Sequence, residues 1–355
     1  MRKWLVLCAT TAVVVVSSGS AAPALADVGC FDRTTQPYTS VVDSHFHLRP
    51  FGGPGIPLAE MGEYWRQTGV RYVNLYGIGQ ILPVDSPCVY YLDCLGTPVL
   101  PSSKNDFENA RDVAQTTVDG VHLTLSMTFP DLANPAGILD QMRQLDSAYP
   151  GKFGWMGEVN LMKQALLGNG AQPASLGAIV SWRPFMDELR RRGMPINIHS
   201  DLGNDADPLK FLYLMETVLS LYPENKIVWA HMGLSNELKA IDPALHIATL
   251  RRLMDQHPNL YLDISWRVLE DSYFSREPIR QQYVPFFDEY SARVIPGTDF
   301  VASRKKDFAV YAEELDVTSR INKYLNDKAF RDIALGQSYF GLLGLPEQAP
   351  PICAA

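Results

Sequence analysis

Eight short apolar runs recur along the chain, and stretches with helical patterning lie between them. Most runs are apolar over several consecutive positions, which is typical of parallel strands covered on both faces. The expected strands are residues 41–46, 71–76, 121–128, 153–159, 195–199, 226–231, 260–264 and 293–297. Eight strand–helix repeats predict an α/β fold, a TIM (β/α)8 barrel in a single domain. An open doubly wound sheet is the alternative, but no GxGxxG motif follows the first strand.

Several expected helices have recognisable ends. Residues 136–148 follow Asn134-Pro135, which predicts a cap and a first-turn proline. Residues 181–192 end at Gly193 with arginines in the last turn, which predicts a helix stop. Further helices are expected at residues 208–221, 243–256 and 278–291, with a helical tail from residue 300 to residue 345.

The first 26 residues indicate export. Arg2 and Lys3 precede an apolar stretch that ends in Ala24-Leu25-Ala26, which predicts a secretory signal peptide cut after Ala26. An uncleaved membrane anchor is the alternative. We therefore expect residues 1–26 to be the signal peptide, 27–40 an N-terminal extension, 41–345 the barrel and 346–355 a C-terminal tail. The mature protein would be secreted or periplasmic.

The charge of the chain restricts its partners. Removing two basic residues with the signal peptide changes the formal net charge from -8 to -10. This acidity argues against nucleic acid or an anionic membrane as the main partner, and it leaves a small-molecule substrate as the expected one.

Four cysteines would remain after cleavage, and an even number in an exported chain predicts disulfides. Their spacing favours Cys88 with Cys94, which closes a short loop, and Cys30 with Cys353, which ties the two chain ends. A closed barrel brings those ends together. Four free thiols are the alternative. The long segment 80–117 contains the short pair, and we expect a disulfide-braced loop at the rim of the catalytic face.

The segment VVDSHFHL carries the strongest chemical signal. His45 and His47 are two positions apart at the end of the first strand, so both imidazoles point to one side. Two neutral imidazoles on one face suit a divalent transition metal such as zinc.

Metal-ligand residue types also end four other expected strands: Glu158, His199, His231 and Asp299. The carboxyl ends of barrel strands open on one face, so these side chains are expected to converge there. A buried charge at that place needs a partner or a metal. The other three of the seven histidines, His122, His246 and His257, are interpreted as structural.

This order of motifs resembles the amidohydrolase superfamily: HxH, then Glu, His, His and Asp after strands one, four, five, six and eight. The segment IALGQSYFGLLGL also resembles the terminal helix of the amidohydrolase-2 branch, which usually has Asn where this chain has Gln337. The resemblance covers residues 41 to 345. Its motifs are specific for metal-dependent barrel chemistry and do not name a substrate.

The resemblance implies roles for these residues. His45, His47 and His199 would be metal ligands, and Asp299 would be a ligand that also shuttles a proton. His231 would bind a second metal or hydrogen-bond the substrate or water. Glu158 would bridge two ions or orient a ligand histidine. The implied cofactor is one or two divalent ions, with zinc the expected metal.

The implied reaction is hydrolysis. A divalent metal lowers the pKa of water from about 15.7 to roughly 7, which makes hydroxide available to attack an ester, lactone or amide bond. Asp299 would pass the proton to the leaving group, and His231 would help to stabilise the oxyanion. Arg267 could bind a substrate carboxylate or be a solvated surface residue. Trp266 and Tyr76 are candidate pocket residues.

Three other functions compete with hydrolysis. The amidohydrolase-2 branch contains non-oxidative decarboxylases, for which release of carbon dioxide would be diagnostic. A metal-dependent deoxyribonuclease is suggested by MGEVNL, but the acidic charge disfavours it. A secreted binding protein that has lost catalysis is disfavoured because Asp299 and His231 are both present.

Overall fold

The computed structural model describes residues 29–37, 39–83 and 85–354, so the expected signal peptide lies outside the described residues. Nine strands form one sheet in the order β10-β9-β8-β7-β6-β5-β2-β1-β11, and every neighbouring pair is parallel. They are β1 (Val42–His47), β2 (Tyr72–Tyr76), β5 (His122–Met127), β6 (Phe153–Met162), β7 (Ile196–Ser200), β8 (Ile227–Trp229), β9 (Leu260–Asp263), β10 (Val294–Ile295) and β11 (Phe300–Val301).

The sheet closes through a broken eighth strand. β10 pairs with β9, β11 pairs with β1, and the residues between them continue the seam. There the Ser44 amide donates to the Pro296 carbonyl at 3.0 Å, and the Asp299 amide donates to the His45 carbonyl at 2.8 Å. The strand was expected to run unbroken over residues 293–297, but Pro296 has no N–H to donate to a ladder. The fold is the expected (β/α)8 barrel.

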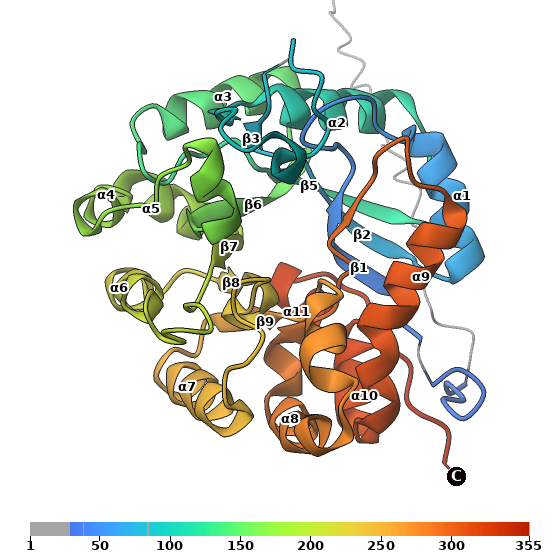
Figure 1. Cartoon of the computed structure of the whole chain (residues 1–355). Helices are drawn as coiled ribbons and strands as arrows, with labels where there is room; N and C mark the ends of the chain where they lie inside the picture. The colour runs from blue at the N-terminus through green and yellow to red at the C-terminus, as the bar shows by residue number, and fades with distance from the viewer. Residues whose placement is uncertain (1–28, 38, 84, 355) are drawn as a thin grey trace, which may run out of the picture.

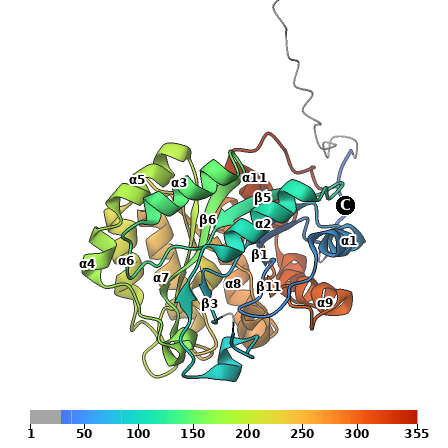
Figure 2. The ribbon, with the colours of Figure 1, turned by 90° about the horizontal axis from the view of Figure 1, so that it is seen from above.

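Helices surround the strands in a ring (Figure 1), and the view from above shows them packed along the outside of the sheet (Figure 2). They are α1 (Leu58–Thr68), α2 (Lys104–Gln115), α3 (Ile138–Ala148), α4 (Leu176–Val180), α5 (Arg183–Arg192), α6 (Leu212–Leu221), α7 (Pro243–Gln256), α8 (Glu277–Tyr290), α9 (Phe308–Ser319), α10 (Asp327–Ile333) and α11 (Gln337–Leu343). One cluster of buried apolar side chains fills the barrel and the layer beneath the helices, as both-face burial of the strands requires. None of the described helices has the length and apolar character needed to cross a membrane.

Several predicted helix starts are wrong. The helix expected from residue 136 begins at Ile138, because Gly137 adopts a left-handed conformation with φ of 85°. The helix expected from residue 208 begins at Leu212, after a turn. The helix expected from residue 181 begins at Arg183, after the short helix α4, and the helical tail expected from residue 300 starts with β11 and becomes helical only at Phe308. α7 has the expected limits, and α5 ends as expected at left-handed Gly193.

The segment after β2, residues 80–117, covers the carboxyl end of the barrel, and we call it the covering segment. It contains the short antiparallel pair β3 (Gln80–Ile81) and β4 (Leu100–Pro101) and the 3-10 helix η1 (Tyr91–Cys94). Its second half is helix α2, which sequence patterning missed because the buried face of α2 is mostly polar, with Asn105, Asp106 and Asn109.

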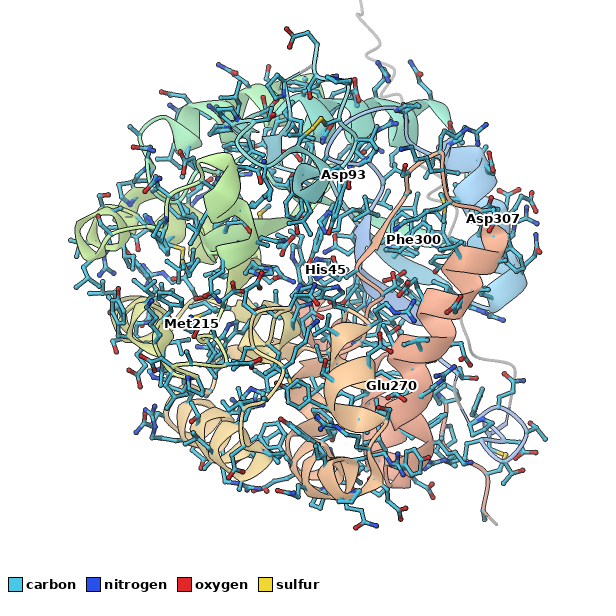
Figure 3. All side chains as sticks on the ribbon, in the orientation of Figure 1. His45, Asp93, Met215, Glu270, Phe300 and Asp307 are labelled. Atoms are coloured by element: carbon cyan, nitrogen blue, oxygen red, sulfur yellow. A yellow bond between two sulfur atoms is a disulfide. The ribbon has the colours of Figure 1, made fainter. Side chains whose placement is uncertain are left out.

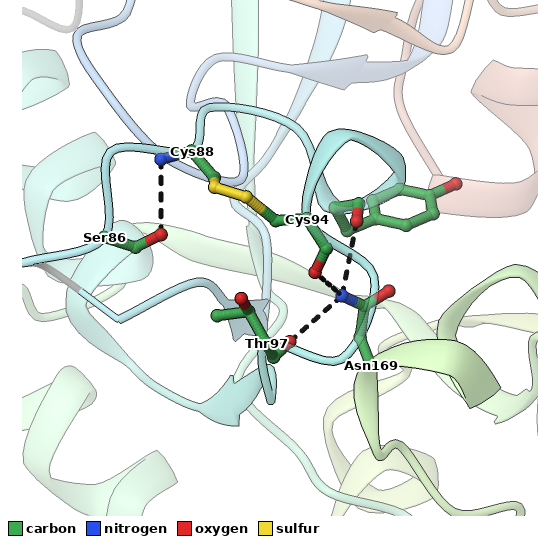
Figure 4. Close-up of a disulfide and its surroundings, with 6 residues drawn as sticks. Ser86, Cys88, Cys94, Thr97 and Asn169 are labelled. Atoms are coloured by element: carbon green, nitrogen blue, oxygen red, sulfur yellow. Dashed lines mark hydrogen bonds between the residues drawn. A yellow bond between two sulfur atoms is a disulfide. The ribbon is translucent and has the colours of Figure 1, made fainter.

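Both favoured disulfide pairings are present. Cys88 and Cys94 brace the covering segment, and Figure 4 shows the Asn169 amide donating to the carbonyls of Tyr91, Cys94 and Thr97 beside the bond. Cys30 and Cys353 join the two ends of the described chain, and the adjacent backbones of Phe31 and Ile352 form a parallel bridge.

Candidate active site

A cavity of about 380 Å³ opens at the carboxyl ends of the strands. Five of the six expected metal-site residues line it: His47, Glu158, His199, His231 and Asp299. The sixth, His45, is fully buried just beneath it and lies near the middle of the ring of helices (Figure 3). Phe51, Tyr90, Tyr91 and Trp266 form aromatic walls. The structure therefore brings the predicted residues together at one end of the barrel.

His45 and His47 point their Nε2 atoms toward each other from β1, 3.2 Å apart. The other nitrogen of each ring faces an acceptor: His45 Nδ1 is 2.5 Å from Asp263 Oδ2, and His47 Nδ1 is 2.7 Å from the Gly77 carbonyl. Each Nδ1 therefore donates a proton to its acceptor, and each Nε2 faces inward, where its lone pair would be available to a metal, as in ligand histidines.

Asp299 lies in the break between β10 and β11. Its φ of 57° is in the left-handed region, which Asp tolerates better than most residues. Its Oδ1 is 3.4 Å from His45 Nε2 and 3.2 Å from His47 Nε2. Thr298 is fixed by buried Asp43, which accepts from the Thr298 amide at 2.9 Å and from its hydroxyl at 2.8 Å. This anchor sets the direction of the neighbouring carboxylate.

Glu158 reaches both sides of the cluster with its two oxygens. Oε2 is 3.4 Å from His47 Nε2 and 3.9 Å from His45 Nε2. Oε1 contacts His199 Nδ1, lies 3.8 Å from His231 Nε2 and accepts from Lys163 Nζ at 3.1 Å.

His199 lies near the end of β7, His231 follows the neighbouring strand β8, and the two imidazoles differ in their partners. The second nitrogen of His199, Nε2, is 2.9 Å from Asp201 Oδ1, so carboxylates face both sides of this ring. His231 follows β8 in the 3-10 helix η3 (Ala230–Gly233) with φ of 53°, whereas a strand was expected to continue to residue 231. Its Nδ1 lies 3.2 Å from the Ser265 carbonyl, which leaves Nε2 facing the cavity.

The donor set fits a divalent metal. His45 Nε2, His47 Nε2 and Asp299 Oδ1 lie 3.2–3.4 Å from one another. Ligands at about 2.0–2.1 Å from a tetrahedral zinc ion would be separated by about 3.3–3.4 Å. Once a metal had replaced the Nε2 protons, two imidazole lone pairs and a carboxylate at these distances would form a donor set for a divalent cation. Further groups within 4.8 Å combine Glu158 with His199 and His231, and His231 with His45 and Asp299.

The charge balance of the site also favours a cation. Burial raises the pKa of Glu158, but Lys163 and His199 outweigh burial and hold the pKa well below its usual range. Burial lowers the pKa of His45, but Asp263 and Glu158 raise it to about 10 in the absence of a metal. The carboxylates thus draw protons onto imidazoles, and a metal would replace those protons.

The remaining predicted residues have different surroundings. Arg267 lines the cavity, but its guanidinium pairs with Asp271 at 2.9 Å, Glu314 at 2.9 Å and Glu313 at 3.5 Å. Binding of a substrate carboxylate by Arg267 stays a prediction. Trp266 lines the cavity, whereas Tyr76 is fully buried and its hydroxyl accepts from Asn197.

Three residues around the site were missed by sequence analysis. Asp263 ends β9 and Asp201 lies two positions after His199, so the rule that found the other strand-end groups would have found both. Lys163 was hidden because the fourth strand was expected to end at residue 159, whereas β6 continues to Met162.

A (β/α)8 barrel with histidines and carboxylates at its strand ends defines a class of metal-dependent barrel enzymes. The family model described as Amidohydrolase matches residues 126–332, more than half of the chain, and the protein therefore belongs to the amidohydrolase family. That match begins after His45 and His47, which the fold brings to the site. A search of curated proteins finds no match.

Solved structures show the same fold. Dihydroorotase from Campylobacter jejuni has a TM-score of 0.51 at 12% identity, over 87% of this chain and 84% of that chain. A putative 2-pyrone-4,6-dicarboxylic acid hydrolase from Pseudomonas putida has a TM-score of 0.51 at 14% identity, over 87% of this chain and 99% of that chain. An amidohydrolase from Burkholderia multivorans with bound zinc has a TM-score of 0.51 at 13% identity, over 86% of this chain and 100% of that chain.

Proposed function

We propose that the protein is an exported, metal-dependent hydrolase that cleaves an ester, lactone or amide bond of a small molecule. The observation that carries this proposal is the set of inward-facing donors at one end of the barrel: His45 Nε2, His47 Nε2 and Asp299 Oδ1 within 3.4 Å of one another. The two disulfides support export, because such bonds persist in oxidising compartments.

His45, His47 and Asp299 would hold a divalent ion, with Glu158 Oε2 beside them. Such an ion, with zinc the best match to the donors, supplies a Lewis acid that polarises the scissile carbonyl and makes water acidic. Asp299 takes the proton of the attacking water and delivers it to the leaving group. His231 accepts a hydrogen bond at Nε2, because its Nδ1 faces the Ser265 carbonyl, and so orients water or substrate.

The cavity is consistent with a small substrate. Its volume of about 380 Å³ is in the range of ligand pockets, and aromatic side chains form part of its wall. Tyr90 and Tyr91 belong to the covering segment, and the Phe51 ring packs against Tyr91. The covering segment therefore limits the size of the substrate and excludes water from the reacting atoms.

A decarboxylase is the second candidate. Lys163, Lys305 and Lys306 line the same cavity, and these cations would suit a carboxylate that either positions the substrate or leaves as carbon dioxide. The reaction product distinguishes the two functions.

The test uses the mature chain from residue 27, purified without chelator. Elemental analysis should find a divalent metal, and a panel of esters, lactones, amides and carboxylic acids should show hydrolysis without release of carbon dioxide. Asp299→Asn should lower kcat by at least about 100-fold, as loss of a proton-transfer group does, while losing much less of its metal. Asp140→Asn provides the control, because Asp140 is exposed on α3 and pairs only locally with Arg143, so this variant should retain both activity and metal.

The proposal would be rejected if the protein bound no metal, or if Asp299→Asn retained full activity. Release of carbon dioxide with no hydrolysis product would favour the decarboxylase instead.

A further inference from the structure

The cations that line the cavity differ in whether they already have an anionic partner. Among the described residues, the lysines and arginines on the cavity wall are Lys163, Arg267, Lys305 and Lys306. Lys163 Nζ lies 3.1 Å from Glu158 Oε1, and the Arg267 guanidinium lies 2.9 Å from carboxylate oxygens of Asp271 and Glu314. The charges of Lys163 and Arg267 are therefore balanced within the protein.

Lys306 lacks such a partner. Its Nζ lies 4.6 Å from the centroid of the Phe300 ring, and it has no ion pair and no hydrogen-bond acceptor within the part of the chain that the structure describes. The side chain is half-buried, and burial lowers the pKa of its ammonium group although Glu314 and Asp299 act in the opposite direction from farther away. Lys305 is exposed, so water can solvate its charge. Lys306 is thus the cavity cation that a bound anion would stabilise most.

The backbone around Lys306 is attached to the site by hydrogen bonds. Lys306 lies in the turn between β11 and α9, and its amide donates to the Ser303 carbonyl at 2.9 Å. At the start of this turn, the Ala302 amide donates to the His47 carbonyl at 2.8 Å. The Phe300 ring that contacts the ammonium group is buried. An anion that binds Lys306 would therefore meet a group that the turn has already positioned.

The position of Lys306 among the other cavity residues indicates the shape of the ligand. Phe300, whose ring lies beside the ammonium group, directly follows Asp299 of the expected metal set. Phe51 and Trp266 form other parts of the cavity wall. A divalent ion would neutralise Asp299 and so remove part of the negative charge that favours the ammonium form of Lys306. A ligand with its reacting bond near Asp299 would then find a cation for an anionic group and aromatic surface for an apolar body.

We propose that the substrate carries a carboxylate that does not take part in the reaction, and that Lys306 binds this group and selects anionic substrates. The inference rests on the proposed hydrolase and deepens it by naming the substrate class. That class is a small carboxylic acid with an apolar or aromatic body and an ester, lactone or amide bond. Lys306 acts in binding alone, so its loss should weaken the binding of anionic substrates and leave the turnover of neutral ones unchanged.

Calorimetric titration tests the binding step without any turnover. The zinc-loaded mature protein is titrated with glutarate and with its monoamide, glutaramate. Each probe has one carboxylate that a metal ion can take, and the two probes differ only in the charge at the other end. The wild type should bind glutarate about 10- to 100-fold more tightly, which is the usual value of a hydrogen bond to a charged group. Lys306→Met should remove this preference, and Lys306→Arg should retain it. Lys210→Met is the matched control and should also retain it, because Lys210 lies 5.1 Å from the Phe211 ring but is exposed and outside the cavity wall.

The titration separates this inference from the proposed function. A protein that shows the Lys306-dependent preference but hydrolyses no compound would reject the hydrolase and support the carboxylate subsite. Equal affinities of the wild type for the two probes, or a preference that persists in Lys306→Met, would overturn the inference whatever the enzyme hydrolyses. Should Lys306→Met fail to fold by circular dichroism, Lys306→Gln replaces it. Kinetics give a second readout: Lys306→Met should raise KM for a carboxylate-bearing ester about 10- to 100-fold with kcat unchanged, and it should leave kcat/KM for the carboxamide analogue unchanged. An equal loss of kcat/KM for both esters would contradict the role in binding.

Discussion

At the scale of single residues, the imidazoles that face inward are held by acceptors on their outer side. His45 contacts Asp263, His47 contacts the Gly77 carbonyl, and His231 contacts Ser265. Such contacts fix which nitrogen carries the proton and how the ring is turned, and carboxylate partners also raise the basicity of a ligand histidine. The donors of the site are therefore positioned before any ligand arrives.

Asp263 should accordingly control metal affinity without touching the metal. Asp263→Asn removes the charge beside His45 Nδ1, and we expect metal affinity to fall about 10- to 100-fold. Competition with a chromogenic chelator measures this change. Asp332→Asn is the control, because Asp332 is also buried but accepts from Ser291 and Lys328, on the amino-terminal side of β10. Equal affinities of the wild type and Asp263→Asn would contradict the role.

His246 should make stability depend on pH. This buried ring lies between the Tyr283 hydroxyl at 2.7 Å and the Met232 carbonyl at 3.0 Å, and burial lowers its pKa to about 4. Between pH 4 and about 6.5 the unfolded chain binds a proton that the folded chain does not, so stability falls as the pH falls through this window. The contribution lost between pH 7 and pH 5 is about 2 kcal/mol.

Urea unfolding at pH 7 and pH 5 tests this expectation. His246→Phe should be less stable than the wild type at pH 7, but its unfolding free energy should fall less between the two pH values. Identical decreases in both proteins would show that His246 does not titrate as stated.

At the scale of elements, the apolar pattern of the sequence predicted where every barrel strand lies, but it did not predict the residues at which strands and helices end. Apolar runs fix where a strand lies, because both faces must be buried. The turn into η3 at His231 and the extension of β6 to Met162 depend on contacts with distant elements, which no local pattern contains. The strand-end rule found His45 and Asp299 because their residue types are costly to bury, and it overlooked Lys163 because that lysine lay beyond the expected strand.

The covering segment is the element with the clearest expected effect. Cys88 and Cys94 close a loop whose Tyr90 and Tyr91 form a cavity wall, and the Asn169 amide supports the same loop. Cys88→Ser with Cys94→Ser should speed proteolytic cleavage within residues 85–99, measured by mass spectrometry. The unfolding free energy should fall by at most about 2 kcal/mol, because the closed loop is short. Unchanged cleavage would show that Asn169 and aromatic packing suffice to order the loop.

At the scale of the whole molecule, the two ends of the barrel domain are joined twice. The Cys30–Cys353 bond spans 323 residues, and Arg33 donates to Asp327 at 2.9 Å and to the Leu325 carbonyl at 2.8 Å. A disulfide that closes a long loop restricts the unfolded chain more than a disulfide that closes a short loop. The tie between the ends should therefore contribute to global stability more than the loop disulfide does.

Cys30→Ser with Cys353→Ser should lower the unfolding free energy by about 2–5 kcal/mol, measured by denaturant titration at neutral pH. The double variant of the short loop is the matched comparison, because it also removes one disulfide. A smaller loss for the long-range pair than for the short pair would contradict this expectation.

The interrupted eighth strand implies an order in which the ligands of the metal site come together during folding. His45 and His47 of the expected metal set come from the first strand, and Asp299 arrives only with the last one, docked through its amide on the His45 carbonyl. A nascent polypeptide that has not yet inserted its final strand has an incomplete coordination sphere. Acquisition of the ion would therefore mark the moment at which the barrel becomes whole.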